Sequence, residues 1–536
     1  MTAGLVPLRR GAVPRPLPGG RWARLAAAAL AAGGAVAAPA LPPPPSPAAL
    51  LSVHVRDRST GEPVPCRITV ACPGGSPADL RPAPGARLAV RPGVAYTGDG
   101  AASLLLPPGE YAVAATRGFE YGLDRRLIRV AEGRASVELR IGREVDTAGW
   151  AACDTHIHTL TYSGHGDCTL DERVLTLAGE GIELPVATEH NLHRDYESAA
   201  MAMGVRRWFT PVVGNEVTTP VGHFNVFPVS LGASPPNHTL LDWQRLLPAI
   251  RRTPGARCVI LNHPADLHSG FRPTDPVRFH PGSGESLDGR EWTMDGMELV
   301  NSGAQQSDLM RPWRDWFSLL NRGRRIAGIG ASDSHDVDAF LVGQGRTYLR
   351  CQDSRPDSIP VAQACDSLLA GRALVSCGLL AEMRVDGREA YGELLRPARE
   401  RVAIRLRVQA PRWIRADRVE VYANGTRIVD LPILHGESAV KLDRTVAVRR
   451  PRHDAWLVAV ATGPGVTEPH WPLRPPYQPT RSHWEPRVVG STNPVYLDAD
   501  GDGRWASPRE QAQAVMAAVR LDPDALMAAL AQRDDA

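Results

Sequence analysis

The sequence predicts a multi-domain protein in which an α/β segment lies between two β-sandwich-like domains. Its 536 residues correspond to three or four domains at roughly 150 residues per domain. Apolar and polar residues alternate in residues 49–146 and again from residue 381, which is typical of short β-strands. Residues 147–380 instead alternate between strand and helix patterns, which is typical of an α/β barrel or a doubly wound sheet.

The composition is that of a globular protein. Hydrophobic residues make up 43% of the chain and charged residues 22%, which argues against global disorder. The formal net charge is only +3, from 61 Lys and Arg against 58 Asp and Glu, which argues against a general polyanion binder. We therefore expect a small-molecule substrate and no nucleic-acid partner, while the sequence leaves the oligomeric state open.

Residues 1–48 are predicted to be a signal peptide followed by a Pro-rich linker. Arginines, among them Arg9, Arg10, Arg21 and Arg24, precede the apolar residues 25–38. This apolar stretch is too short to span a bilayer comfortably and fits a signal peptide. Ala38-Pro39-Ala40 has the small residues of a cleavage site, and LPPPPSP follows as a stiff linker. The pattern favours an exported protein, periplasmic or extracellular and without a stable membrane span. The alternatives are a disordered Ala/Pro-rich leader or a misplaced start codon.

The segments LSVHVRD, CRITVAC, LLLPPGEYAVAAT and ASVELRI predict the strands of the first β domain, residues 49–146. Gly- and Pro-containing turns such as STGEPVP separate these strands, as in a small β-sandwich. The segment resembles the carboxypeptidase-regulatory-like modules that many exported enzymes carry.

In the α/β segment, Thr169 and Glu172 form a capping box that predicts a helix ending at Gly179 or Gly181. LLDWQRLLPAIRR and DLMRPWRDWFSLLNRG are the clearest other helices. After residue 380, RVAIRLRVQA, RVEVYANGTRIV and AWLVAVATG predict strands, with a hairpin turn at Asn424-Gly425. Two short helices close the chain. Ser507-Pro508-Arg509-Glu510 caps the first, and Asp522-Pro523 starts the second.

Residues of metal-binding type follow the predicted strands of the α/β segment. His156 and His158 are two positions apart on a strand, so both side chains project to one face. In α/β barrels the carboxyl ends of the strands converge, so ligands far apart in sequence can meet there. Seven histidines with carboxylates exceed the needs of one tetrahedral zinc ion and suit two or three bridged ions. The candidate ligands are His156, His158, His165, His190, Glu216, His223, His263, Asp333 and His335.

The motifs DTHIHT, ATEHN, LNHP and SDSH, with GNE and GHFNVF between them, resemble those of the PHP (polymerase and histidinol phosphatase) metallohydrolase superfamily. The resemblance covers about residues 147–380 and implies a distorted seven-stranded (β/α) barrel. The phrases SGHGD and GHFNVF, together with the flanking β domains, are most similar to the CehA/McbA branch. That branch is named for carbaryl hydrolase, an exported carbamate-cleaving enzyme.

The resemblance implies three ion positions. The first would be held by His156, His158, Glu216 and Asp333, and the second by Glu216, His223 and His263, with Glu216 bridging the two. The third would be held by His165, His190 and His335. The sequence departs from the family pattern at Glu189, where Asp is commoner. It also departs in the loop before His165, which follows His156 by nine positions, whereas some relatives have a shorter loop.

The implied reaction is hydrolysis of a phosphoester or a carbamate/amide-type ester by a metal-bridging hydroxide. Zinc, manganese and iron all suit such ligands. The predicted catalytic residues are His156, His158, Glu216, Asp333 and His335. The predicted substrate-binding residues are Arg346, Arg372, His193 and His268.

Two other functions stay open. A nuclease-like phosphodiesterase is disfavoured by the balanced charge and by the lack of a basic, aromatic-interleaved groove. A non-catalytic exported binding protein with a relic PHP barrel is disfavoured by the intact ligand set.

Two further features carry weaker predictions. Asp498, Asp500 and Asp502 in DADGDG match the start of a calcium loop, although Glu510 falls one place late and also suits the helix cap. A polar capped turn is therefore the other interpretation. The eight cysteines contain no CxxC motif, and Cys66 with Cys72 is one candidate disulfide in an exported chain. Cys153 is expected to be a buried thiol rather than a nucleophile.

Overall fold

The structure is a computed structural model that describes residues 48–268, 270–434, 436–478, 482–520 and 522–531. Apart from its last residue, the predicted signal peptide and linker lies outside the described residues. Among the described residues, no helix combines the length and the apolar character needed to cross a bilayer.

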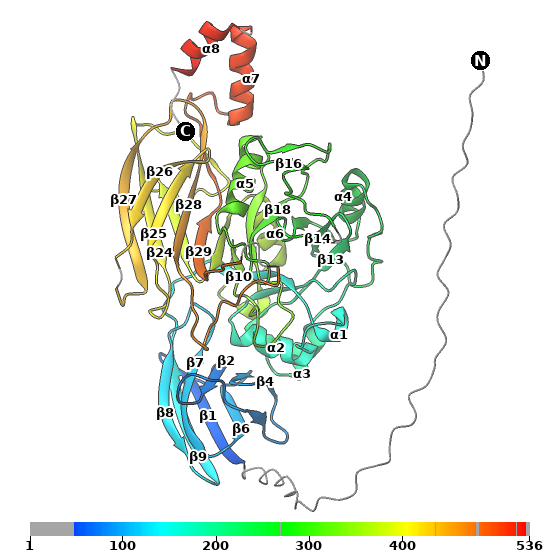
Figure 1. Cartoon of the computed structure of the whole chain (residues 1–536), viewed down its shortest axis with the longest axis vertical. Helices are drawn as coiled ribbons and strands as arrows, with labels where there is room; N and C mark the ends of the chain where they lie inside the picture. Colours follow the sequence, from blue (N-terminus) through cyan, green and yellow to red (C-terminus); the bar gives the residue numbers. More distant parts are fainter. Residues whose placement is uncertain (1–47, 269, 435, 479–481, 521, 532–536) are drawn as a thin grey trace, which may run out of the picture. The chain divides into compact units, whose positions relative to one another are not determined.

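The N-terminal region folds into two β-sheets around a shared apolar core (Figure 1). One sheet has the strand order β3-β6-β1-β9, and the other has the order β4-β5-β2-β7-β8. Leu51 and Val53 alternate inward from β1, as the predicted two-residue period requires. The strands are β1 (Ala49–Asp57), β2 (Cys66–Ala71), β3 (Arg81–Pro82), β4 (Leu88–Arg91), β5 (Val94–Thr97), β6 (Ala101–Leu106), β7 (Gly109–Thr116), β8 (Asp124–Val130) and β9 (Arg134–Ile141).

The strands of the α/β segment, residues 147–380 and called the middle segment below, divide between two sheets. Five strands belong to an eleven-stranded sheet: β10 (Trp150–Ile157), β11 (Leu184–Ala187), β12 (Val212–Val213), β20 (Arg346–Arg350) and β21 (Ala373–Cys377). Five others form a sheet of their own: β13 (Asn215–Thr219), β14 (Gly222–Phe227), β15 (Cys258–Leu261), β18 (Gly296–Asn301) and β19 (Ala327–Ala331). A separate pair contains β16 (Phe279–His280) and β17 (Glu285–Ser286).

The predicted closed (β/α)7 barrel is not confirmed in the described residues, whose architecture is multi-domain and rich in strands. Among the described residues, no continuous ladder joins the two sheets of the middle segment. The isolated bridges Ile157↔Ser334 and His190↔Glu216 connect them at strand ends. The pairs β10–β20, β20–β21, β13–β14 and β14–β15 are antiparallel, whereas a (β/α) barrel needs parallel neighbours. A two-residue turn joins β13 to β14, which is too short for the crossover that parallel strands require.

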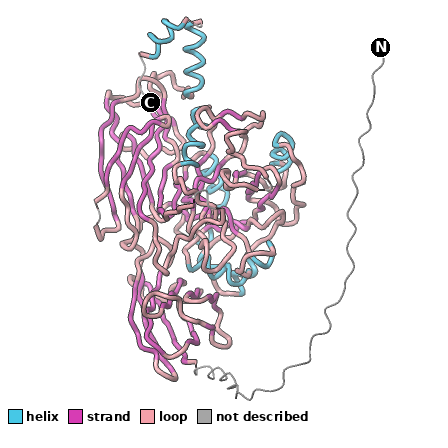
Figure 2. The backbone as a smooth tube through the Cα atoms, in the orientation of Figure 1, coloured by secondary structure: helices cyan, strands magenta, loops and turns pink. Residues whose placement is uncertain are grey.

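The helices predicted for the middle segment are confirmed. Helix α2 (Leu170–Gly179) begins at a Thr169–Glu172 capping box, and α4 (Trp243–Arg251) and α5 (Arg311–Asn321) lie within the two other predicted stretches. Figure 2 shows that helices gather in this segment and are otherwise confined to the C-terminal end. The remaining elements are α1 (Leu160–Ser163), α3 (Glu197–Ala202), α6 (Val361–Leu369) and the 3-10 helices η1 (Arg206–Trp208) and η2 (Pro356–Ser358).

The eleven-stranded sheet continues from the middle segment into the C-terminal strands, because β21 pairs with β29. Beyond β29 the order is β28-β25-β26, and β22-β24-β27 form a separate sheet. The division into domains near residue 380 stays a prediction. The C-terminal strands are β22 (Leu380–Val385), β23 (Leu394–Leu395), β24 (Arg401–Gln409), β25 (Arg418–Ala423), β26 (Thr426–Pro432), β27 (Val440–Arg449), β28 (Ala455–Pro464), β29 (Arg487–Thr492) and β30 (Val495–Leu497).

The local turn and cap predictions of the C-terminal region are confirmed. Asn424 and Gly425 join β25 to β26 with φ angles of 50° and 93°, the left-handed conformation that such a hairpin turn requires. Ser507 and Glu510 form the capping box of α7 (Pro508–Val519), and Asp522 caps α8 (Pro523–Leu530).

All eight cysteines are free thiols, so the suggested Cys66–Cys72 disulfide is not formed. Cys66 is fully buried, and Cys72 is partly exposed. Cys153 lies buried on β10, where burial raises the pKa of its thiol well above the usual value. That environment agrees with a buried strand thiol, because a nucleophile needs a lowered pKa.

A buried ion pair links the N-terminal β region to the middle segment. Arg67 on β2 lies 3.2 Å from the carboxylate of Glu180, and both side chains are fully buried. The hydroxyl of Tyr96 donates a 2.7 Å hydrogen bond to the same carboxylate. Removing one partner of such a pair leaves an uncompensated buried charge, which is far more costly than losing an exposed pair.

We expect Glu180→Gln to lower the free energy of unfolding by about 3–5 kcal/mol. The matched control is Arg126→Ala, which removes the exposed partner, 58% accessible, of an ion pair with Asp124 and should change stability by less than about 1 kcal/mol. Urea unfolding followed by tryptophan fluorescence compares the two. Equal effects of the two substitutions would contradict the assignment of Glu180 as an anchor.

Candidate metal centre

A cavity of about 380 Å³ collects most of the predicted ligands. Phe340 and Tyr477 also line it. Its polar lining consists of histidines and carboxylates from distant parts of the chain: His165, His190, Glu216, His223, His263, His268, Asp333, His335 and Asp336. His156 and His158 lie beside this lining and are fully buried.

His156, near the end of β10, and His158, directly after it, converge on carboxylates, as their spacing predicts. Nε2 of His156 lies 3.2 Å from Oε1 of Glu216 and 3.3 Å from Oδ1 of Asp333. Nε2 of His158 lies 3.3 Å from the same Asp333 oxygen and 3.7 Å from Oε2 of Glu216. These four residues form the first predicted position, and three of them, His156, His158 and Asp333, have all their ligand atoms within 4.8 Å of one another.

Glu216 lies at the centre of the site, with only 1% of its side chain exposed. Its Oε1 is 3.1 Å from Nδ1 of His223 and 3.6 Å from Nε2 of His263. Its Oε2 is 2.5 Å from Nδ1 of His190. Glu216 thus contacts histidines of all three predicted positions, and its role as a bridging ligand stays a prediction.

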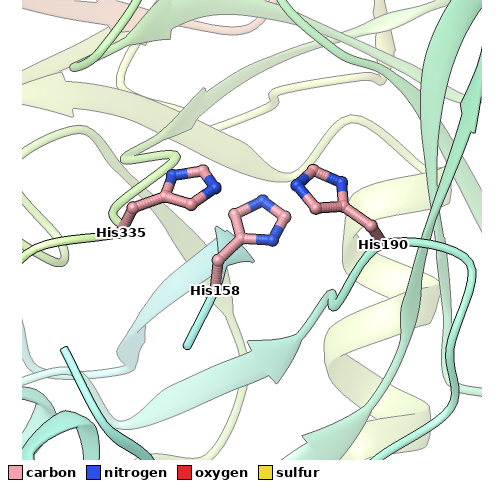
Figure 3. Close-up of side chains that lie close together, drawn as sticks. All are labelled: His158, His190 and His335. Atoms are coloured by element: carbon pink, nitrogen blue, oxygen red, sulfur yellow. The ribbon is translucent and has the colours of Figure 1, made fainter. Parts of the chain in front are cut away.

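A third group contains His158, His190 and His335, whose rings face one another (Figure 3). The ring centroid of His158 lies 4.4 Å from that of His190 and 4.1 Å from that of His335. His165, which was predicted here, lines the cavity and lies with its ring 5.1 Å from His190 and 4.4 Å from His335. The compact ligand group of the structure, however, contains His158 in its place.

These groups fit divalent metal ions. Two ligands held about 2.1 Å from one zinc ion at the tetrahedral angle are about 3.4 Å apart, close to the separations around Asp333 and Glu216. The buried Nε2 atoms of His156, His158 and His335 have no hydrogen-bond partner among the described residues. A buried polar atom without a partner is costly. Metal ions bound in the His156–His158–Asp333 group and in the His158–His190–His335 group would satisfy these nitrogens.

The electrostatics of the site also suit cations. Burial alone would raise the pKa of Glu216, but His156, His190 and His223 hold it well below its usual value. Burial lowers the pKa of His335 to about 4. It likewise lowers the pKa of His158, an effect that His335 and His190 reinforce. Burial opposes, but nearby carboxylates raise, the pKa values of His156, His190 and His263. Metal ions bind ionised carboxylates and neutral imidazoles, so ions at these three histidines would displace protons.

His268 lines the cavity and lies among the candidate ligands, while its predicted contact with substrate stays a prediction. Its ring centroid is 4.3 Å from the rings of both His223 and His263, and the three histidines form a further compact ligand group. Its buried Nε2 has no hydrogen-bond partner among the described residues. His268 lies outside the LNHP motif, so the sequence did not indicate that it could be a metal ligand.

Three other predicted substrate-binding residues do not reach the cavity. Arg346 is fully buried, 3.6 Å from Glu120, and donates to the main-chain oxygens of Gly343 and Glu180. Arg372 lines a separate pocket together with Gly371 and Gly392. His193 is buried, and its Nδ1 is 3.0 Å from the carbonyl oxygen of Ala233. The charge of Arg346 thus serves a buried ion pair, and substrate binding by these three residues stays a prediction.

Backbone strain is concentrated at the site. His263, Asp333, Asn191 and Phe340 have positive φ angles of 24°, 54°, 53° and 46°. Left-handed conformations of residues other than glycine persist where the surroundings enforce them, which is typical of functional sites. Here they turn the two ligands His263 and Asp333 into the cavity immediately after the ends of β15 and β19.

Sequence reasoning missed Glu298 on β18. Its Oε1 lies 2.8 Å from Nδ1 of His156, and its Oε2 accepts hydrogen bonds from the main-chain N–H of His263 and the amide of Asn301. A carboxylate that binds the second nitrogen of a ligand histidine fixes the orientation of the ring. The available signal was a charged residue in the otherwise apolar strand GMELVN.

The DADGDG loop gathers a different set of carboxylates than predicted. Asp498 and Asp500 lie close to Asp454, which the sequence did not suggest, whereas Asp502 is outside that group. Asp454 accepts hydrogen bonds from the main-chain N–H groups of Ala499 and Ala506. A polar turn explains these bonds, and calcium binding stays a prediction.

The cavity and its ligand groups define a candidate multinuclear metal centre. No protein-family model matches the chain, and no curated protein matches it. A solved two-domain protein from Bacteroides vulgatus, described as containing a predicted PHP-like metal-dependent phosphoesterase, is 15% identical. The likeness covers 57% of this chain and 88% of that chain, with a TM-score of 0.30. That score is too low to establish a common fold, so the geometry of the residues carries the argument.

We expect Glu298→Gln to weaken metal binding at the His156 position by roughly 10- to 100-fold, because His156 loses the carboxylate that orients it. Competition with a chromophoric chelator measures the affinity. The control is Glu291→Gln, which changes an exposed glutamate of the preceding loop. Unchanged affinity in Glu298→Gln would show that Glu298 does not support the ligand.

Proposed function

We propose that this protein is a multinuclear metal-dependent hydrolase of the PHP superfamily, related to its CehA/McbA branch. The observation that carries the proposal is the convergence of eight histidines and two carboxylates from separate elements on one cavity. They are His156, His158, His165, His190, Glu216, His223, His263, His268, Asp333 and His335. A relic site would have no need to retain unpartnered, buried nitrogens that face carboxylates.

The proposed chemistry divides between ions and side chains. Bound divalent ions would lower the pKa of a water molecule towards neutrality and polarise the scissile bond. Glu216 and Asp333 hold the negative charge that attracts the ions, and Glu298 keeps the ring of His156 in place. Phe340 and Tyr477 add two aromatic rings to the lining of the cavity.

The lining of the cavity favours a carbamate or amide-type ester as substrate. Among the described residues that line it, no side chain is that of lysine or arginine. An uncharged reacting group needs no such cation, and the aromatic rings suit an apolar substituent. A phosphoester is the second candidate, because adjacent ion positions can hold the oxygens of a phosphoryl group. Export, supported by the leader pattern alone, is part of the proposal.

Metal analysis of the purified full chain, loaded with zinc or manganese, should find two to three ions per molecule. The loaded protein should then hydrolyse members of a panel of aryl carbamates, aryl esters and p-nitrophenyl phosphates, and lose this activity with a chelator. Preference for carbamates would support the first substrate class, and preference for phosphates the second. Failure to bind any ion after reconstitution would overturn the hydrolase proposal.

Changing His156 and His158 together to Ala should lower the rate of hydrolysis by roughly 10³-fold or more. The first ion position loses two of its four ligands, and the third group loses His158. Steady-state kinetics on the best panel substrate gives the ratio. His238→Ala is the matched control, since His238 is exposed in a loop away from the ligand groups. Retention of activity by the double variant would place the active site elsewhere.

A further inference from the structure

The loop between α1 and α2 brings His165 to the cavity and is tied to the chain around His335. The main-chain N–H groups of Asp167 and Cys168 both donate to the carbonyl oxygen of His335, at 3.3 Å and 3.1 Å. A methyl group added at Gly166 would lie 2.5 Å from the same oxygen, so the loop packs closely against this segment. The positions of His165 and His335 are therefore coupled through the backbone.

Arg91, at the end of β4 in the N-terminal β region, holds this loop with its whole guanidinium group. Its Nε donates to Oδ2 of Asp167 at 2.9 Å, and its Nη2 donates to the main-chain oxygen of Asp167 at 2.6 Å. Its Nη1 donates to Oε1 of Glu172, in the first turn of α2, at 2.8 Å. The side chain of Arg91 is only 20% exposed. A planar fork that binds three acceptors fixes orientation, which a single exposed ion pair does not.

Asp167 passes this restraint to the second ligand segment. Its Oδ1 accepts a 2.8 Å hydrogen bond from the main-chain N–H of Val337. Its own N–H donates to Oδ1 of Asp336 at 3.0 Å, and Asp336 lines the cavity. The carboxylate of Asp167, bound by Arg91, therefore joins the loop that carries His165 to the segment that carries His335.

Attachment of the N-terminal region does not by itself require this contact. The buried Arg67–Glu180 pair already links that region to the middle segment. The capping box of α2 is likewise complete without Arg91, because Thr169 and Glu172 bond each other's main chain. The particular effect of Arg91 falls on the loop, which exposes His165 and contains two residues, Gly164 and Gly166, with φ near 78°.

We propose that Arg91 is a positioning residue for the metal centre, through which the N-terminal β region fixes the edge formed by His165, His190 and His335. The inference rests on the proposed function in that metal ions must bind. It predicts that the affinity for the ion near His165, His190 and His335 depends on Arg91, which lies outside the ligand-bearing segment. The affinity for the ions nearer Glu216 and Asp333 should not depend on Arg91.

The test compares full-length Arg91→Ala, Arg91→Lys and Arg140→Ala with the unchanged chain, each loaded with zinc. Arg140 is the matched control, since it forms an exposed ion pair with Glu138 in the same β region. Ion content and chelator competition should show that Arg91→Ala loses affinity for one ion by roughly 10- to 100-fold and retains the others. Arg91→Lys keeps the charge without the fork and should fall between, and Arg140→Ala should bind like the unchanged chain.

Circular dichroism and thermal melting of each metal-free variant distinguish positioning from folding. If Arg91→Ala does not fold, Asp167→Asn provides the same test from the loop side and should show the same selective loss. Full ion content with unchanged affinity in Arg91→Ala, or an equal loss of all ions in the folded variants, would overturn the inference. Absence of metal from the unchanged chain would overturn the proposed function as well, so the two failures are distinguishable.

Discussion

The buried carboxylate of Glu216 is the constraint on which the rest of the site depends. A carboxylate with 1% exposure must be compensated, because an unpaired buried charge costs several kcal/mol. Its neighbours are histidines from different segments, including His156 on β10, His190 after β11 and His223 on β14. Divalent ions between these groups would supply the missing positive charge. The segments that carry the histidines must therefore meet at Glu216.

The division of the middle segment into two sheets provides the space for this meeting. The two bridges that join the sheets, Ile157↔Ser334 and His190↔Glu216, contain ligands or lie directly beside them. Where a ladder is interrupted, side chains of both strands can turn into the gap rather than alternate across a continuous sheet. The positive φ angles of His263 and Asp333 perform this turn. The gap between the two sheets thus lies at the site itself.

The sequence was informative wherever chemistry is local. Capping residues such as Thr169 and Ser507 predicted helix starts, and the spacing of His156 and His158 predicted two side chains on one face. It was uninformative where the outcome depends on strand pairing. The antiparallel pairing of β20 with β10 and β21 could not be read from apolar runs, because a buried strand has the same composition in either direction. Glu298 was missed for the same reason, since only the pairing of β18 brings it to His156.

The flanking β regions contribute contacts that hold the ligand-bearing loops in place. Loops that carry ligands bury little apolar surface, so contacts from outside must offset the entropy lost in ordering them. The C-terminal region supplies Arg474, which pairs with Asp338 at 3.1 Å, and Tyr477, whose main-chain N–H donates to Gly303 at 3.0 Å. Tyr477 also lies edge-on to Phe340 across the cavity rim, with centroids 6.5 Å apart. The pairing of β21 with β29 attaches the C-terminal region to the sheet of the middle segment. Tyr477 of that region forms part of the cavity wall, so a metal site built from the middle segment alone would lack this part.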